Sequence, residues 1–303
     1  MAMKNVKSAH FRQIDHQIKA INQRNGTIIL PSPEAYDKFP WTRRHFAKKP
    51  AEGYFVWVKK ETGVPLTTCV TIASPKIQQN LINLLVVEKN VKVKANVVCN
   101  AAKNNLYGIH QAKGKLILKE GAVLIYNQFH QWGKNDFVNP NYEFILGKNS
   151  QLTYTYKNLL PPKELKLKTI IHAKKGASCQ LTTTINGIKT KISVEEGIFL
   201  EGKDSRGILQ LRLVGRKESQ IKAASKIVAQ KAGFGHLDCQ GLLIDKKAVI
   251  DLIPRLICQN PKAQLTHEAS IGKISDQQLN YLRSRGLSEK EAINLIVSGF
   301  LEI

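Results

Sequence analysis

The feature that most constrains the fold of this chain is a strand-and-turn repeat in its middle. Short segments rich in Val, Ile, Leu, Thr and Tyr alternate with turns that contain Asn90, Gly121, Asn149 and Gly176, which lie 31, 28 and 27 positions apart. Asn and Gly tolerate the positive φ that tight turns often require. Without intervening helices, this repeat predicts a coiled or stacked all-β body over residues 51–243, such as a β-helix or solenoid. A β-sandwich is the alternative.

Lysines in this zone alternate with apolar residues, as in Val91-Lys92-Val93-Lys94 and Leu165-Lys166-Leu167-Lys168. A period of two predicts strands with one buried face and lysines that point to solvent. This interpretation also explains much of the net charge of +23, which by itself would suggest a nucleic-acid partner. No dense basic block is present, and residues 241–303 carry only eight basic and seven acidic residues. A solvated, basic sheet face is favoured, and a nucleic-acid footprint is the alternative.

The two ends of the chain carry spacings typical of helices. In residues 1–50, His10, Ile14, Ile18 and Ile21 recur at intervals of three and four, which predicts a helical N-terminal region. In residues 244–303, the spacing of the apolar residues Val249, Leu252, Ile253 and Leu256 predicts a helix that Pro254 kinks or ends. Two capping boxes follow at Ser275 and Ser288, and Gly286 is suited to close the first of these helices.

Several functional classes are excluded by the 303-residue sequence. There is no apolar run of about 18 residues, and the first ten residues do not resemble a signal peptide. An odd number of cysteines, five, does not suit a disulfide framework and favours a reducing cytoplasm. The chain lacks the phosphate-binding Gly-x-x-x-x-Gly-Lys-Ser/Thr loop, the Gly-x-Ser-x-Gly elbow and Cys-x-x-Cys pairs. We therefore expect no bound nucleotide, no membrane association and no enzymatic activity.

The remaining chemistry lies in a few ligand-type side chains. His236, Asp238 and Cys239 fall within four residues, and in a strand His236 and Asp238 would share one face while Cys239 points to the other. His267-Glu268 follows in a later segment, and Cys99 ends an apolar strand. Thiolate, imidazole and carboxylate together suit iron or zinc better than magnesium. The other cysteines, Cys69, Cys179 and Cys258, are interpreted as small buried hydrophobes.

The segment 263–300 closely resembles the C-terminus of the SufB/SufD family, the scaffold proteins of SUF iron–sulfur cluster assembly. The resemblance rests on Thr266-His267-Glu268-Ala269-Ser270-Ile271-Gly272-Lys273-Ile274, on Gln278-Leu279-x-Tyr281-Leu282-x-Ser284-Arg285-Gly286 and on Glu291-Ala292-x-x-Leu295-Ile296-Val297-x-Gly299-Phe300. Weaker similarity reaches back to about residue 50, through Tyr54-Phe55-Val56-Trp57-Val58 and Gln131-Trp132. The chain is similar to a short, SufB-like minimal form.

The resemblance implies a mainly β fold, with a right-handed parallel β-helix flanked by N-terminal and C-terminal α-helical regions. It also implies that the C-terminal helices dock on a SufC-like ABC-type ATPase. We expect a homodimer of this chain with two ATPases, supplied by a cysteine desulfurase or another sulfur donor and delivering clusters to apo-proteins. The expected cargo is a transient iron–sulfur cluster of the 4Fe–4S type. Whether a flavin takes part is left open.

Site residues carry over from the family one by one. Cys239 matches the essential cysteine of SufB-type members, which implies that it is the sulfur acceptor and a cluster ligand. His267 and Glu268 match the His-Glu pair of SufB-type members, whereas SufD-type members have glycine in place of the glutamate. Cys99 matches the cysteine where sulfur enters the β-helix, and His130 occupies the place of a polar residue before the Trp132 landmark.

His236 and Asp238 are further ligand candidates on chemistry alone, outside the family pattern. Two other functions stay open from the sequence. One is a basic β-solenoid that binds nucleic acid, and the other is a structural, SufD-like subunit without cluster ligands of its own.

Overall fold

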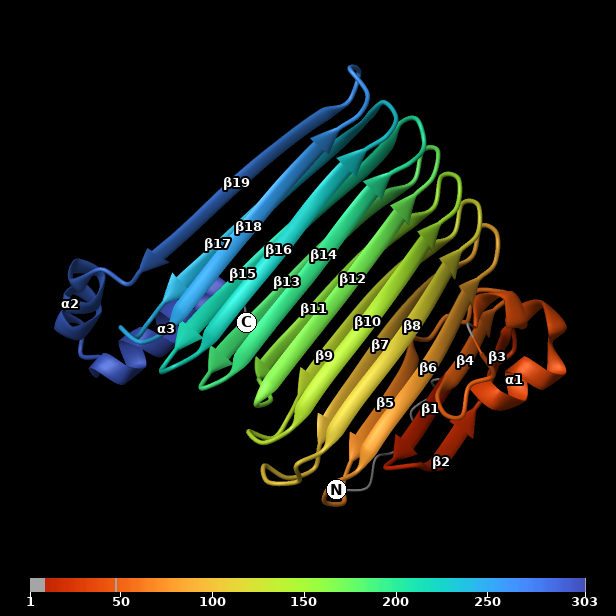
Figure 1. Cartoon of the computed structure of the whole chain (residues 1–303), viewed down its shortest axis with the longest axis horizontal. Helices are drawn as coiled ribbons and strands as arrows, with labels where there is room; N and C mark the ends of the chain where they lie inside the picture. Colours follow the sequence, from red (N-terminus) through yellow and green to blue (C-terminus); the bar gives the residue numbers. More distant parts are fainter. Residues whose placement is uncertain (1–8, 47, 303) are drawn as a thin grey trace.

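The computed structural model describes residues 9–46 and 48–302, and within them 59% of the chain is strand and 12% is helix. The prediction about a signal peptide rests mainly on residues 1–8, which lie outside the described residues. The described strands form two sheets of ten and nine members, and from β4 onward successive strands alternate between the sheets. They make a solenoid of about eight turns. Figure 1 shows the strands side by side, with α1 at one end and α2 and α3 at the other.

The ten-stranded sheet contains β1 (Ala9–Ile14), β2 (Gln17–Asn22), β5 (Leu66–Ile72), β7 (Lys92–Ala101), β9 (Val123–Gln131), β11 (Gln151–Leu160), β13 (Ser178–Ile188), β15 (Ser205–Arg216), β17 (Gly233–Leu243) and β19 (Gln264–Lys273). The nine-stranded sheet contains β3 (Thr27–Pro31), β4 (Tyr54–Val58), β6 (Gln78–Val87), β8 (Ile109–Leu118), β10 (Phe137–Leu146), β12 (Glu164–Ala173), β14 (Lys191–Leu200), β16 (Gln220–Ala229) and β18 (Val249–Cys258). Among the described strands, only β1–β2 and β3–β4 pair antiparallel. The prediction of a mainly β, parallel β-helix is confirmed, and the antiparallel sandwich is excluded.

The repeated turns follow from the residues that the sequence singled out. Asn90, Gly121, Asn149 and Gly176 all have positive φ, between 55° and 67°. The turns stack because each amide donates to the turn of the next coil, as Asn90 N–H does to the Glu120 carbonyl at 3.0 Å. A Cβ on Gly121 would lie 2.1 Å from Asn90 Oδ1, so the asparagine side chain occupies the space that glycine leaves.

Alternation along each strand builds the core. In β7, Val93 and Ala95 are buried while Lys92 and Lys94 are exposed, as the period of two predicted. The same pattern holds in β12, where Leu165 is fully buried between half-buried Glu164 and exposed Lys166. Because each coil stacks on the next in register, the inward side chains form one continuous core along the solenoid.

The prediction of helix at residues 10–21 is wrong. Ala9, Phe11 and Gln13 are buried on alternate positions of β1, which pairs parallel with β5, and a turn at Asp15 leads back into β2. The β1–β2 hairpin extends the sheet at the first coil. Burial of alternate side chains of β1 in the core outweighs the apparent helical spacing. The helices of this region are α1 (Ser32–Lys38) and the short 3-10 helix η1 (Pro40–His45), which pack aromatic side chains against β4.

The helix predicted around Val249 to Leu256 is also wrong, because this segment is β18 and the following one is β19. The solenoid therefore runs to Lys273 rather than ending at residue 243. Pro254 is accommodated because β18 is the last strand of its sheet, where a missing N–H costs little. Because apolar residues lie on both faces of β18, their spacing in the sequence does not show the period of two that is typical of a strand.

The two C-terminal helices are confirmed as α2 (Asp276–Ser284) and α3 (Glu289–Leu301), each with a complete capping box. Val297 and Leu301 of α3 pack on Val214 and Leu242 of the solenoid. α2 buries no side chain within the described part of the chain. No helix among the described residues is long and apolar enough to cross a membrane.

Candidate functional site

Cys239 lies on the inner face of β17. Leu237 and Cys239 lie inside, with 0% and 1% exposure, and the alternation of the strand places His236 and Asp238 on the other face, where Asp238 is also buried. The sheet therefore separates the thiol from the two ligand candidates that precede it.

The outer candidates have partners of their own. Asp238 forms an ion pair with Arg212 and also accepts a hydrogen bond from Gln240 Nε2 at 3.2 Å. His236 Nδ1 lies 2.8 Å from Thr266 Oγ1. As ligands beside Cys239, His236 and Asp238 are therefore not supported by the geometry.

The pairing of β19 with β17 decides where the His-Glu pair lies. His267 is in register with Leu237, and Glu268 is in register with Asp238. Paired residues of parallel strands share a face, so His267 lies on the same face as Cys239, two positions from Ala269, which pairs with Cys239, and Glu268 lies on the opposite face. Both side chains are exposed. Within residues 9–46 and 48–302, no group of three or more His, Cys, Asp and Glu side chains is arranged to hold a metal ion. The expected set of Cys239, His267 and Glu268 is thus only partly brought together by one chain.

The environment of Cys239 favours the protonated thiol. Burial, followed by the negative charge of Glu196, raises the pKa of the Cys239 thiol to about 12. The Ser225 hydroxyl, which otherwise has no hydrogen-bond partner among the described residues, lowers that pKa in part. A reaction or a metal that needs the thiolate must therefore supply a base or a compensating positive charge.

Cys99 lies on the same inner surface, nearer the N-terminal end. It is in register with His130 on β9, and both are buried. Burial raises the pKa of the Cys99 thiol and lowers that of the His130 imidazole. His130 is held by Tyr156 Oη at Nδ1 (3.1 Å) and by Gln128 Nε2 at its other nitrogen (2.9 Å). His130 is therefore part of an interior polar cluster next to Cys99.

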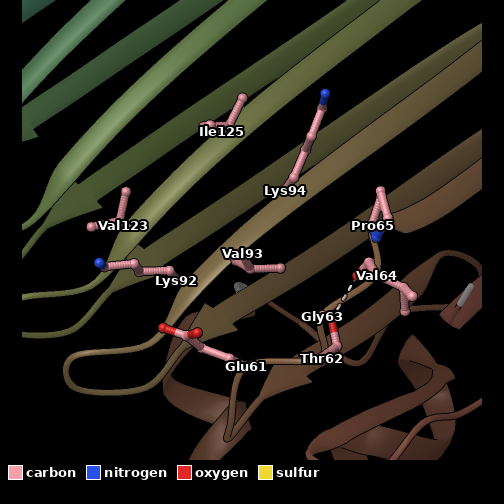
Figure 2. Close-up of a pocket in the computed structure, with 10 residues that line it drawn as sticks. All are labelled: Glu61, Thr62, Gly63, Val64, Pro65, Lys92, Val93, Lys94, Val123 and Ile125. Carbon is pink, nitrogen blue, oxygen red and sulfur yellow. Dashed lines mark hydrogen bonds between the residues drawn. The ribbon is translucent and has the colours of Figure 1, made fainter.

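Surface hollows lie away from the cysteines. Figure 2 shows one of about 410 Å³ between the loop 61–65 and the outer face of β7 and β9, with Lys92 and Lys94 beside Val123 and Ile125. Thr62 Oγ1 donates to the Val64 carbonyl at 2.6 Å and fixes the loop. None of the cysteines lines this hollow, so the thiol chemistry belongs to the interior and not to this surface.

Comparison with known proteins identifies the family of this chain. A family model described as SUF system FeS cluster assembly, SufBD core domain, matches residues 70–300. The chain belongs to the SufBD family. A SufBD family protein of Archaeoglobus fulgidus is 26% identical over 99% of this chain and 86% of its own length. One of Pyrococcus horikoshii is 30% identical over 92% of this chain and 67% of its own.

SufB of Bacillus subtilis is 27% identical over 82% of this chain, but the match covers only 55% of SufB. A SufBD relative in Methanothermobacter thermautotrophicus is matched over 62% of its length. The resemblance read from the C-terminal motifs is confirmed, and it ties the chain to iron–sulfur cluster assembly in the SUF system.

Sequence reasoning missed the interior polar residues of this SufBD chain that carry no family motif. Glu196 and Thr183 are both fully buried and hydrogen-bonded to each other. The signal for Glu196 was present, because Ile192, Val194 and Ile198 occupy alternate positions around it and mark its face as the core face. An acidic residue on an apolar face is the exception that sequence analysis should flag.

Proposed function

We propose that this chain is a scaffold on which iron–sulfur clusters are built and from which they pass to apo-proteins. The observation that carries the proposal is the place of Cys239: it is a buried thiol on the inner face of β17, one strand from the end of the sheet, and His267 lies on the same face of the neighbouring strand β19. Thiolate and imidazole are both ligands of iron in such clusters. The role is that of a binding platform, without enzymatic turnover of its own.

Sulfur delivery fits the interior of the solenoid. A cysteine desulfurase or another donor would load Cys99, and sulfane sulfur would then move along the inner face to Cys239. The polar side chains between the two cysteines support this route, because His130, Tyr156 and Thr183 occupy inner positions of successive coils. A purely apolar core would give a hydrosulfide or persulfide group no hydrogen-bond partner.

The C-terminal helices are the proposed docking site of a SufC-like ABC-type ATPase. α2 buries none of its side chains in the described structure, and Tyr281 is 60% exposed. Leu295 on α3 is 53% exposed, next to the side of that helix that packs on the solenoid. Because the chain lacks a phosphate-binding loop, ATP-driven movement would have to come from such a partner.

The end of the solenoid supports a homodimer. β18 and β19 are the last strands of their sheets, and no described strand pairs with their outer edges. Exposed edges of this kind pair readily with another chain. A second copy would bring its own His267 and Glu268 toward the Cys239 end and would give an assembly of two scaffolds and two ATPases.

Anaerobic reconstitution of the purified chain with ferrous iron and sulfide tests the proposal. The wild type should develop the brown colour of a cluster, and Cys239→Ser should lose it. Cys179→Ser is the matched control, because Cys179 is also buried on an inner face. A Cys239→Ser variant that keeps the fold and the full cluster yield would favour the structural, SufD-like role instead.

The lysines of the turns favour nucleic-acid binding as a second candidate. Lys175, Lys203 and Lys231 lie in successive stacked turns, where coils are about 4.8 Å apart, and the described structure gives them no ion-pair partner. Exchanging all three for glutamate should abolish a salt-dependent affinity for single-stranded DNA if this function is real. Equal, weak binding by the variant and the wild type would remove the candidate.

A further inference from the structure

The edge of β7 is uncovered at its beginning. β7 pairs with β9 from Lys92 onward, but its pairing with β5 starts only at Ala95, which lies opposite Leu66. Within the described structure, no residue pairs with residues 92–94 on the β5 side. Three residues of the strand therefore present backbone N–H and C=O groups along one open edge, which is a template for pairing with another chain.

The loop before β5 explains why the pairing stops at Leu66. Pro65 has no N–H to donate, and the Val64 carbonyl already accepts a hydrogen bond from Thr62 Oγ1 at 2.6 Å. The loop 61–65 and the strands β7 and β9 instead enclose the hollow of about 410 Å³ that Figure 2 shows. The open edge of β7 therefore borders a space large enough for another segment of polypeptide.

Two lysines give the open edge a positive charge. Lys92 and Lys94 are exposed on the outer face of β7, one on each side of the buried Val93. Neither lysine has an ion-pair partner in residues 9–46 and 48–302, and among the described residues that line the hollow only Glu61 is acidic. Alternate residues of a strand lie about 6.6 Å apart, so the two ammonium groups match carboxylates at alternate positions of a second strand.

The other walls of the hollow are apolar. Val64 and Pro65 of the loop and Val123 and Ile125 of β9 line it, and Ile125 is 41% exposed. The residues of β9 stand next to the lysines, because Lys92 is in register with Val123. The surface therefore suits a segment that carries both acidic and apolar side chains.

We propose that residues 92–94 are a docking site for an extended acidic segment of a partner protein, which adds to the ten-stranded sheet as a short strand. Carboxylates at alternate positions of this segment pair with Lys92 and Lys94, and the side chain between them points inward as Val93 does. A single-stranded nucleic acid would neutralise the lysines but would leave the backbone edge unpaired, so a peptide fits the site better. The inference does not depend on the proposed scaffold function.

Fluorescence anisotropy with the full chain and a labelled probe tests the site. The probe is a hexapeptide of alternating Glu and Val with both ends blocked, and the same peptide with Gln in place of Glu is its control. The Glu peptide should bind with an affinity that falls as salt is added, and the Gln peptide should bind more weakly. No binding of the Glu peptide at millimolar concentration, or equal binding of the two peptides, would overturn the inference.

Variants of the chain locate the binding site. Lys92→Gln and Lys94→Gln should each weaken binding about two- to fivefold, as the loss of one cross-strand charge pair implies. Glu61→Gln should strengthen binding, because it removes the carboxylate of the hollow that repels the probe. Lys113→Gln is the matched control, because Lys113 is exposed on β8 but its strand is paired on both sides at that residue. A loss in Lys113→Gln as large as that in Lys92→Gln, or weaker binding by Glu61→Gln, would contradict the assignment.

N-methylation of the probe tests the backbone pairing without altering the protein. Alternate amides of a strand face the same neighbour, so methylating one alternate set of amides should abolish binding and methylating the other set should leave it. Equal binding of the two methylated probes would exclude pairing at the open edge. Displacement of the probe by single-stranded DNA, whose own binding is lost in Lys92→Gln and Lys94→Gln, would assign the site to nucleic acid and would also overturn the proposal.

Discussion

Replacing Glu196 by glutamine should change how the stability of the metal-free protein depends on pH. Burial raises the pKa of this carboxyl from its usual 4.5 to about 7 in the folded chain. The unfolded chain therefore ionises first as pH rises, and the folded state loses stability between about pH 4.5 and pH 7. Above pH 7 both states are ionised and the loss is complete.

The magnitude follows from the difference between the two pKa values. One pKa unit corresponds to about 1.4 kcal/mol, so the shift from 4.5 to about 7 costs the folded state about 3 kcal/mol at pH 8. Glutamine does not ionise, so Glu196→Gln removes this pH-dependent cost. The difference in unfolding free energy, variant minus wild type, should therefore grow by about 3 kcal/mol from pH 4.5 to pH 8.

Urea denaturation followed by far-ultraviolet circular dichroism, in chelator and at four pH values, measures this difference. All other titrating groups are shared by the two proteins and cancel. Glu195→Gln serves as the control, because its side chain is 47% exposed and its ion pair with Lys168 contributes at most about 1 kcal/mol. A Glu196→Gln difference that stays constant with pH, or that falls as pH rises, would refute the assignment of a protonated carboxyl to the core.

Further tests address the turns, the helices and the thiols. Gly121→Ala should lower the unfolding free energy more than Gly63→Ala, since both have positive φ but only the first Cβ would meet the stacked asparagine; equal losses in urea denaturation would contradict the stacking. Ser288→Ala should cost about 1 kcal/mol and increase hydrogen exchange in α3 alone, and exchange spread over the solenoid would contradict a local cap. Iodoacetamide at pH 8 should modify exposed Cys258 in the native protein and buried Cys99 only after unfolding, as mass spectrometry of peptides would show.

The body of the solenoid could be predicted because its signals are local. A period of two needs only neighbouring residues, and the positive φ at Asn90 and Gly121 follows from residue type. The predictions of helix at residues 10–21 and 249–256 were wrong because the local spacing of apolar residues there resembles that of a helix. Val249 and Ile253 carry apolar side chains on the outer face of β18, so an edge strand with two apolar faces resembled a helix.

The sequence names candidate residues for the site, but it does not determine on which face of the sheet each of them lies. Whether Glu268 lies on the same face as Cys239 depends on whether the number of residues in the coil between them is odd or even. Because the turns differ in length, the sequence does not fix that number. The structure pairs Cys239 with Ala269, a coil of 30 residues, so Glu268 falls one position short and points outward. A coil one residue shorter would have placed it inside.

The stacking of coils also places Glu196 opposite a column of inward-facing polar side chains. One inner column of the ten-stranded sheet is polar or thiol-bearing in every coil from β9 to β17 except at Leu211; its members are Gln128, Tyr156, Thr183, Leu211 and Cys239. The facing column of the other sheet carries Thr169, Glu196 and Ser225. Glu196 accepts its hydrogen bond from Thr183, the last polar member before Leu211, and Ser225 acts on Cys239, the first member after it. The opposite wall therefore places the Glu196 carboxyl and the Ser225 hydroxyl on either side of the single apolar step in the column.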